Sequence, residues 1–373
     1  MGSGTQALAM ALLDAKARRA VARPEVILPA YGCPDLVTAS VYAGVRPRLV
    51  DTARGRWGYD LEALTAALSA STVAIVGVNL LGCGDQAPEL YQIARQHGAA
   101  LVQDSAQHLP REPAAWLGEY VVLSFGRGKP LNLLRGGALL HAPGTGATPV
   151  AMAPRTAAGA RQSPAVRRLE ALAFNIATHP RLYAVSRRLL GGSLGQTHYK
   201  PLEAIENATP SFVAEVASAL AGYRDHPGYD ARVWSAACDA WRAHGVDVLS
   251  CVSSAVPDPG GVRLRLPLLA PDPRTRDALV AALDHQGLGA TAMYGQSMER
   301  LPGVPGEVAA QGPFPNATEL AGRLLTLPTH AWVTPQAVQL GQRTVDAVLA
   351  SACASVAGSD ARTTHTTVQP ARR

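Results

Sequence analysis

Lysine is scarce in this sequence. Its 373 residues contain three lysines, Lys16, Lys129 and Lys200, against 31 arginines. Arginine stays charged in proteins, whereas a desolvated lysine can lose its proton and attack an aldehyde to form an imine. A lysine between two apolar segments of such a chain therefore calls for a chemical reason, and Lys129 lies in that position.

Cysteine is also scarce. The five cysteines are an odd number and none of them forms a CxxC pair. This argues against both a disulfide framework and a zinc site, so we expect free thiols. They are Cys33, Cys83, Cys238, Cys251 and Cys353.

Long apolar runs are absent. No segment reaches the roughly 20 apolar residues of a membrane span, and no charged-then-apolar leader precedes the first predicted helix. We therefore expect a cytoplasmic protein. Basic residues are not interleaved with aromatic ones, and no recognised nucleic-acid module is present, so we expect no nucleic-acid partner.

The composition and pattern favour an α/β fold. With 47% hydrophobic and 17% charged residues the chain can bury a sizeable core, and its length favours two domains. Between Glu25 and Gly82, short β-branched runs alternate with helical patterns such as Asp35–Ala43 and Asp60–Ala70. This alternation is typical of a mainly parallel sheet with helices on both faces.

The sequence around Lys129 predicts a turn between two buried strands. Tyr120–Phe125 forms one apolar run and Gly136–His141 the next, and Gly126 and Gly128 lie between them. The pattern thus predicts that Lys129 lies in a tight, glycine-rich turn. The alternative interpretation is a solvated lysine in a surface turn.

A carboxylate precedes this turn by 25 residues. Asp104 ends the apolar run GAALVQDSAQ, and ligands bind at the carboxyl ends of strands in open α/β sheets. Pyridoxal phosphate needs such a carboxylate on its pyridinium nitrogen, together with a lysine on its aldehyde carbon. The alternative interpretation of Asp104 is a cap or turn former.

The first residues of the chain predict a phosphate cradle. Gly2-Ser3-Gly4-Thr5 leads directly into an apolar-periodic helix, so backbone amides and hydroxyls meet at a helix N-terminus. Taken alone, such a tetrapeptide is more often a loop.

In this order and spacing the motifs resemble the DegT/DnrJ/StrS-type aminotransferases, which are fold-type I, pyridoxal-phosphate-dependent sugar aminotransferases. The resemblance covers most of the chain. It is carried by SGTQALAMAL, EVILPAY, AGVRPRLVDT, STVAIVGVNLLG, ALVQDSAQ, SFGRGK, RGGALL and RLLTLPTHAWVTP.

The resemblance implies a role for each site residue. Lys129 would be the catalytic lysine that bonds to the cofactor, Asp104 the pyridinium partner and Gln107 a neighbour of the cofactor ring. The phosphate would be held by Ser124, Gly4 and Thr5.

The resemblance also implies the reaction and the partners. An amino acid, expected to be glutamate, would donate its amino group to a keto-sugar nucleotide for polysaccharide, glycoconjugate or secondary-metabolite biosynthesis. Relatives that carry histidine in place of the lysine dehydrate their substrate instead. Fold-type I enzymes build the pocket from two chains, so a homodimer is expected. The alternative is a non-catalytic cofactor-binding or scaffold homologue.

The predicted organisation has three parts. A large cofactor-binding domain covers residues 1–230, a smaller α/β domain covers residues 231–355, and a disordered tail covers residues 356–373. Residues 151–200 form a basic helical insertion whose net charge of +7 exceeds the +6 of the whole chain. Its basic side chains are Arg155, Arg161, Arg167, Arg168, Arg181, Arg187, Arg188 and Lys200.

Three interpretations of this insertion stay open. The helical hairpin at 166–190 can be a solvated face, a docking surface for a sugar-nucleotide diphosphate, or a weak contact with an anionic membrane surface.

The sequence departs from the family pattern in three places. The phosphate motif begins almost at Met1, where the family normally carries several dozen residues before it. We favour a start-site or truncation effect as the explanation, and a degenerate homologue is the alternative. Cys33 occupies the position where the family often stacks an aromatic ring, so either Tyr31 stacks or a thiol packs there. Glu206 and Asn207 stand where an Asn-x-Arg element would reach the partner subunit's phosphate.

Overall fold

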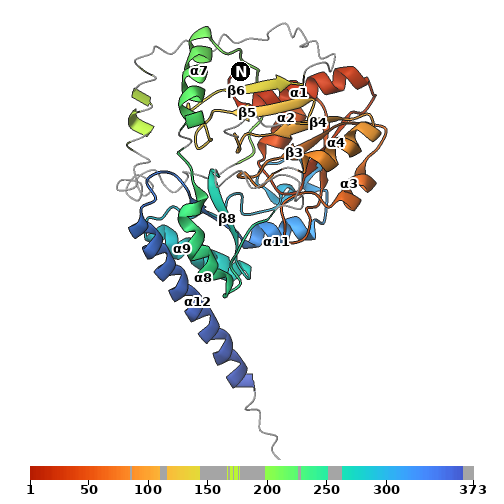
Figure 1. Ribbon diagram of the computed structural model, residues 1–373. Helices are drawn as coiled ribbons and strands as arrows, with labels where there is room; N and C mark the ends of the chain where they lie inside the picture. Colours follow the sequence, from red (N-terminus) through yellow and green to blue (C-terminus); the bar gives the residue numbers. More distant parts are fainter. Residues whose placement is uncertain are drawn as a thin grey trace, which may run out of the picture.

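The structure is a computed structural model, and it describes residues 1–84, 86–109, 116–142, 166, 169–170, 172–174, 176, 198–225, 228–250 and 263–363. The strands of its larger sheet are β1 (Glu25–Pro29), β2 (Arg46–Val50), β3 (Thr72–Val78), β4 (Ala100–Asp104), β5 (Tyr120–Ser124) and β6 (Gly137–His141). Their order is β2-β1-β3-β4-β5-β6, and all pairs are parallel except β5 with β6 (Figure 1). This is the mainly parallel α/β sheet that the sequence predicts.

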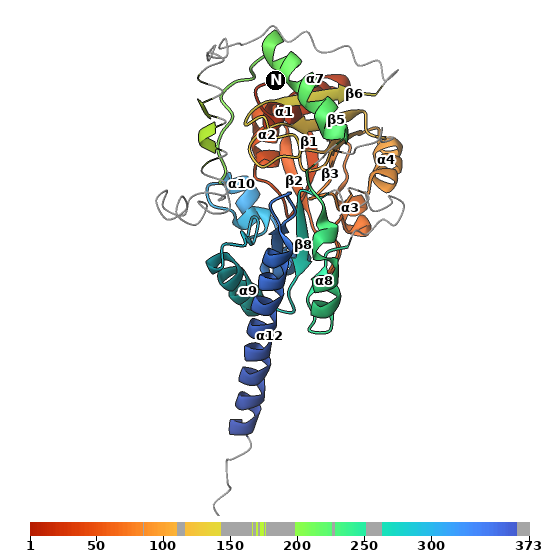
Figure 2. The ribbon, with the colours of Figure 1, turned by 60° about the vertical axis from the view of Figure 1, so that its left-hand side comes forward.

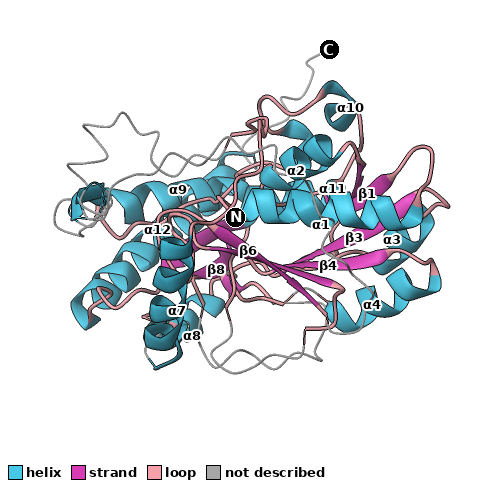
Figure 3. Ribbon diagram, turned by 90° about the horizontal axis from the view of Figure 1, so that it is seen from above, coloured by secondary structure: helices cyan, strands magenta, loops and turns pink. Residues whose placement is uncertain are grey.

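Helices cover both faces of this sheet, because alternate side chains of its strands point to opposite sides. Val26 and Leu28 of β1 lie in one core with the first two helices, whereas Ile27 between them lies in another with the next two. Figure 3 shows the two helical layers on either side of the strands. The helices are α1 (Gly4–Arg19), α2 (Asp35–Ala43), α3 (Leu61–Ala67) and α4 (Ala87–Gln96).

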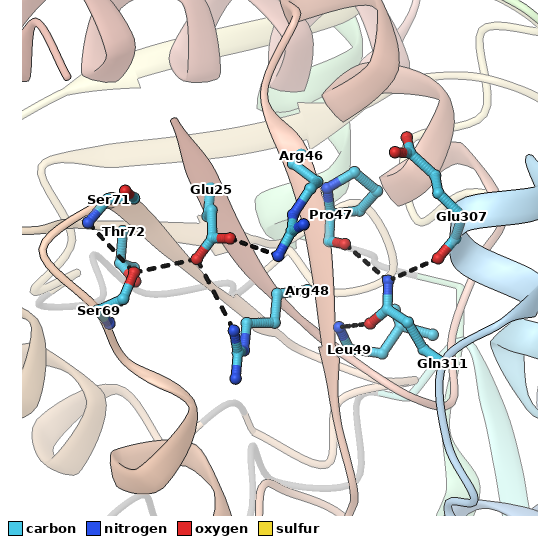
Figure 4. A network of polar contacts seen from close by, with 10 residues as sticks. All are labelled: Glu25, Arg46, Pro47, Arg48, Leu49, Ser69, Ser71, Thr72, Glu307 and Gln311. Carbon is cyan, nitrogen blue, oxygen red and sulfur yellow. Dashed lines mark hydrogen bonds and ion pairs between the residues drawn. The ribbon is translucent and has the colours of Figure 1, made fainter. Parts of the chain in front are cut away.

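A buried carboxylate marks the start of β1. Glu25 is only 7% exposed, and its oxygens accept bonds from the Arg46 guanidinium at 2.7 Å and the Ser69 hydroxyl at 3.0 Å (Figure 4). Arg48 lies 4.0 Å away on the same edge. The burial of this charge is thus compensated by specific partners.

The outer edge of β2 forms backbone hydrogen bonds with the side chain of Gln311, which is distant in the sequence. The Leu49 amide donates to Gln311 Oε1 at 2.8 Å, and Gln311 Nε2 donates to the Pro47 carbonyl at 2.9 Å (Figure 4). The amide group of Gln311 therefore takes the place of a neighbouring strand, and it covers an edge that would otherwise be open to pairing with another chain.

A second, smaller sheet lies in the C-terminal part. Its strands are antiparallel in the order β7-β8-β9, and the indole of Trp234 donates to the Pro328 carbonyl beneath the surrounding helices. The elements are β7 (Asp247–Val248), β8 (Arg265–Leu269), β9 (Leu324–Pro328), η1 (Ala231–Trp234), α8 (Ser235–Arg242), α9 (Pro273–His285) and α12 (Pro335–Thr363). The remaining elements are α7 (Pro210–Asp225), η2 (Met298–Arg300), α10 (Gly306–Ala309) and α11 (Pro315–Arg323).

Helix α12 runs outward from this sheet in both side views and reaches into the segment predicted as a tail (Figures 1 and 2). The predicted domain boundaries stay predictions. The arginines of the predicted basic insertion, Arg155 to Arg188, lie outside the described residues. None of the helices in the described part is long and apolar enough to cross a membrane.

The two sheets are joined by residues 298–324, which pack on the larger one. Asp51, at the end of β2, accepts bonds from the Asn316 and Ala317 amides at 3.0 and 2.8 Å, and so holds the start of α11. The Met298 amide donates to the Ala30 carbonyl just after β1. Asp51 therefore has a structural role and lies away from the predicted catalytic residues.

We predict that Gln311→Ala lowers the free energy of unfolding by about 1–3 kcal/mol, because it leaves the Leu49 amide and the Pro47 carbonyl without partners. Urea denaturation followed by circular dichroism measures this. Gln339→Ala, at an exposed position of α12, is the matched control and should change stability by less than about 0.5 kcal/mol. Equal stability of both variants would contradict the edge-pairing role.

Candidate active site

The predicted site residues gather around one cavity at the carboxyl ends of β3, β4 and β5. Its volume is about 220 Å³. In open parallel sheets this is the edge where ligands bind. The predicted residues that line it are Gly4, Thr5, Asp104, Gln107, Ser124 and Lys129.

Lys129 lies in the predicted turn after β5. Its backbone amide donates to the Gly126 carbonyl at 3.3 Å, and Gly128 has a φ of +68°, which favours glycine. The Phe125 amide donates to the Gly136 carbonyl at 2.9 Å, so the turn is closed at its base. The Lys129 side chain is half-buried, and no partner of its ammonium is found among the described residues. The amine is therefore available for chemistry.

Asp104 is the last residue of β4. One of its carboxylate oxygens accepts from the Ala106 amide at 2.9 Å, and its carbonyl accepts from the Asn79 amide at 3.0 Å. The loop after the strand thus holds the carboxylate on the cavity wall.

The start of α1 forms a cradle against the end of β5. A Cβ atom on Gly4 would lie 2.7 Å from Ser124 Cβ and 3.0 Å from Ser124 Oγ, so only glycine lets the serine approach the helix this closely. The Ser3 hydroxyl caps the helix by accepting from the Gln6 amide. The amides of Gly4 and Thr5 have no acceptor within the helix, because they belong to its first turn.

The tight packing of β6 explains the RGGALL motif. A Cβ atom on Gly137 would lie 2.5 Å from the backbone of Ser3 and Gly4. The Gly136 amide donates to the Gly2 carbonyl at 2.8 Å. The segment after the lysine turn therefore holds the helix start in place.

Gln107, which also lines the cavity, is held by a residue from the C-terminal part. Gln107 Nε2 donates to the Tyr294 hydroxyl at 2.7 Å, and the Leu81 amide donates to Gln107 Oε1 at 3.3 Å. Tyr294 also lines the cavity. Sequence reasoning could not show its contact with Gln107, which joins residues 187 positions apart.

The choice between Tyr31 and Cys33 is decided by the geometry. Cys33 lines the cavity, whereas Tyr31 is fully buried and packs against the Tyr294 ring with centroids 5.5 Å apart. Burial, and secondarily the Asp35 carboxylate, raise the pKa of the Cys33 thiol to about 12. The thiol is therefore neutral at physiological pH.

Asp35 is a charged lining residue that was not identified from the sequence. Asp35, the first residue of α2, lines the cavity, and its Oδ2 accepts from the Thr5 hydroxyl at 2.9 Å. From the sequence it is an acidic residue in the first turn of a predicted helix, which is a common arrangement. Only the packing of α2 beside α1 shows that it faces the cradle.

The altered Glu206-Asn207 element lies beside a second cavity of about 170 Å³. The Gly2 amide donates to the Glu206 carbonyl, and the Glu206 amide donates to Gln6 Oε1. Arg135 lines the same cavity, with its guanidinium 5.4 Å from the centre of the Phe212 ring. This element thus contacts the helix start of its own chain.

The larger sheet has one lysine turn and one helix start on the same cavity. This arrangement is the one expected of the fold-type I, pyridoxal-phosphate-dependent aminotransferases. The chain belongs to the DegT/DnrJ/EryC1/StrS aminotransferase family, whose sequence profile matches residues 1–153 and 252–347. The match covers about two thirds of the chain. It confirms the predicted family and, with it, the fold class and the type of cofactor.

Two curated enzymes match shorter stretches. One is the UDP-N-acetyl-3-dehydro-alpha-D-glucosamine 3-aminotransferase of Acidithiobacillus ferrooxidans, 31% identical over 105 residues, which are 28% of this chain and 28% of that enzyme. The other is the dTDP-4-dehydro-2,6-dideoxy-D-glucose 3-dehydratase of Saccharopolyspora spinosa, 34% identical over 107 residues, which are 28% of this chain and 23% of that enzyme. Each match thus spans less than a third of the relative's length.

Among solved structures, NtdA from Bacillus subtilis with its bound cofactor PMP has a TM-score of 0.65. The alignment covers 93% of this chain and 72% of that one at 16% identity. At this identity the likeness shows the fold alone.

The cavity fits pyridoxal phosphate in its donors and their arrangement. Gly4 leaves room for the Ser124 hydroxyl beside the helix amides, which is a cradle for an anion. Lys129 and Asp104 lie on the same cavity, so an amine and a carboxylate are both available to the ring. The Asp35 carboxylate is the one group that does not suit a phosphate.

We predict that Gly4→Ala weakens the binding of pyridoxal phosphate at least tenfold, because the added methyl group displaces the Ser124 side chain. An absorbance titration of the purified protein with the cofactor measures this. Gly222→Ala is the matched control, since a Cβ atom at that helical glycine meets nothing within 4 Å. Wild-type affinity in Gly4→Ala would contradict the assignment of the cradle.

Proposed function

We propose that this protein is an aminotransferase that moves an amino group from an amino acid, with glutamate as the expected donor, to a keto-sugar nucleotide. The observation that carries the proposal is the meeting of Lys129, Asp104 and the Gly4–Ser124 cradle on one cavity. Family membership and the curated 3-aminotransferase relative support the same reaction.

Each residue has a role in this proposal. Bound pyridoxal phosphate supplies an electron sink for the carbanion that forms at the amino acid. The Asp104 carboxylate would keep the pyridine nitrogen protonated, and the Ser124 hydroxyl and first-turn amides of α1 would bind the phosphate. Lys129 would hold the cofactor through its amine, and its free Nζ would remove the proton from the donor's α-carbon.

The presence of Lys129 favours transamination over dehydration. One of the curated relatives is a 3-dehydratase, and the resemblance associates dehydration with histidine at the lysine position. This chain has lysine there, and its amine is without a partner among the described residues, so it can work as both acid and base. A non-catalytic scaffold is the second candidate, and the altered Glu206-Asn207 element is what favours it.

The substrate side of the proposal rests on family likeness. The acceptor's diphosphate would dock on arginines of 166–190, which lie outside the described residues, or this segment would contact an anionic membrane surface weakly. Cytoplasmic action and a role in polysaccharide, glycoconjugate or secondary-metabolite biosynthesis belong to the same proposal.

The central test is a half-reaction. We predict that glutamate changes the absorbance spectrum of the wild-type protein loaded with pyridoxal phosphate. The band of the lysine-bound cofactor should disappear, and the band of pyridoxamine phosphate should appear. Lys129→Ala should lose the imine that borohydride reduces to a permanent cofactor attachment, and its rate should fall at least a thousandfold, because no other lysine is found among the described residues that line the cavity.

Lys200→Ala is the matched control, because Lys200 is exposed and, among the described residues, its contact is that of its backbone carbonyl with the Thr38 hydroxyl. Its half-reaction should be unchanged. If neither glutamate nor any other amino acid converts the wild-type spectrum while the cofactor is bound, the scaffold candidate is favoured.

We predict a homodimer in solution. The resemblance implies a pocket built from two chains, and large apolar side chains are exposed in the single chain, Leu169 by 67% and Val213 by 58%. Light scattering at micromolar concentration should give twice the 38.9 kDa chain mass. A monomer under these conditions would contradict the shared pocket.

A further inference from the structure

One carboxylate of the cavity lies where the phosphate of the cofactor would be held. Asp35 Oδ2 accepts the hydrogen bond of the Thr5 hydroxyl at 2.9 Å, and Thr5 belongs to the first turn of α1. The Ser124 hydroxyl faces the neighbouring residue of the same turn, Gly4. All four residues line the cavity. The cradle therefore contains a negative charge of its own.

The Thr5 hydroxyl cannot serve both anions. A threonine hydroxyl has a single proton, so it donates to the Asp35 carboxylate or to a phosphate oxygen. Two acceptors around one hydroxyl oxygen, each at about 2.8 Å, lie within roughly 6 Å of each other. A phosphate bound at the helix start would thus be close to Asp35, and like charges at this separation repel each other strongly in a partly buried site.

The other charges of the cavity do not remove this repulsion. Asp104 adds a second negative charge, which the ring nitrogen would take up. Lys129 is assigned to the end of the cofactor away from its phosphate, and Arg127, the other cation that the described residues contribute to the cavity wall, is exposed to solvent. Exposed charges are screened, so Arg127 compensates Asp35 weakly.

We propose that Asp35 is a positioning residue that lowers the affinity of this site for the phosphate group of its cofactor. It does so by engaging the Thr5 hydroxyl and by repelling the phosphate. The inference rests on the proposed function, because it concerns how the same site binds a phosphorylated pyridoxal compound. One consequence is that the cofactor exchanges readily, so that the purified protein is only partly loaded unless cofactor is supplied.

The test compares pyridoxamine 5′-phosphate with pyridoxamine. Neither has an aldehyde, so neither bonds to Lys129, and the pair differs only in the phosphate. Dissociation constants are measured by calorimetry or protein fluorescence for wild type, Asp35→Asn and Asp35→Ala. Asp35→Asn removes the charge and keeps an oxygen for the Thr5 hydroxyl, whereas Asp35→Ala removes both.

We predict that Asp35→Asn binds pyridoxamine 5′-phosphate at least fivefold tighter than wild type, and Asp35→Ala at least tenfold tighter. Pyridoxamine affinity should be unchanged in both. Asp60→Asn is the matched control, because Asp60 also begins a helix, capping α3 through the Glu62 and Ala63 amides, and does not line the cavity. It should leave both affinities at their wild-type values.

Other outcomes overturn the inference. If wild type binds the phosphorylated probe and Asp35→Asn binds it equally or more weakly, Asp35 supports the cradle by orienting Thr5. If the Asp35 variants bind pyridoxamine more tightly by the same factor, Asp35 does not act through the phosphate. If neither wild type nor any variant binds the phosphorylated probe, the proposed function itself is wrong and this inference with it.

Discussion

The close approach of the first turn of α1 to the end of β5 is the contact on which the site depends. Helix and strand meet at Gly4 and Ser124, where no side chain larger than hydrogen fits between them. Gly137 allows the same closeness between β6 and the Ser3 backbone. Because β5 also leads into the lysine turn, this one contact fixes the distance between the helix amides and Lys129. The predicted phosphate cradle and an amine thereby line a single cavity.

The elements that could be predicted from the sequence are those with a strong local pattern. β1 and β3 are buried on both faces and are nearly continuous apolar runs, so their place in a parallel sheet follows from the sequence. The lysine turn and Asp104 could also be predicted, because the turn follows an apolar run directly and Asp104 ends one. Ends of parallel strands meet at one edge, and this rule was enough to bring Asp104 and Lys129 together.

What could not be predicted depends on contacts between distant residues. Thr5 and Asp35 are 30 positions apart on different helices, and Gln107 and Tyr294 are 187 positions apart. Periodicity says which face of a helix is buried, but not which neighbouring helix start lies beside it. The choice between Tyr31 and Cys33 has the same origin. They are two positions apart just beyond the end of β1, and only the packed chain shows that Tyr31 lies behind Tyr294 while Cys33 reaches the cavity.

The C-terminal part completes the site through the same kind of long-range contact. Asp51 holds the start of α11, Gln311 pairs with the edge of β2, and the Met298 amide bonds to Ala30. These contacts fix the segment after Tyr294 against the larger sheet, and the Tyr294 hydroxyl in turn fixes the Gln107 amide. The part of the cavity wall that Gln107 and Tyr294 form is therefore only as rigid as this interface. A change that loosened the interface would leave Lys129, Asp104 and the cradle in place, since all three belong to the larger sheet and its helices, and would alter the shape of the cavity on the Tyr294 side alone.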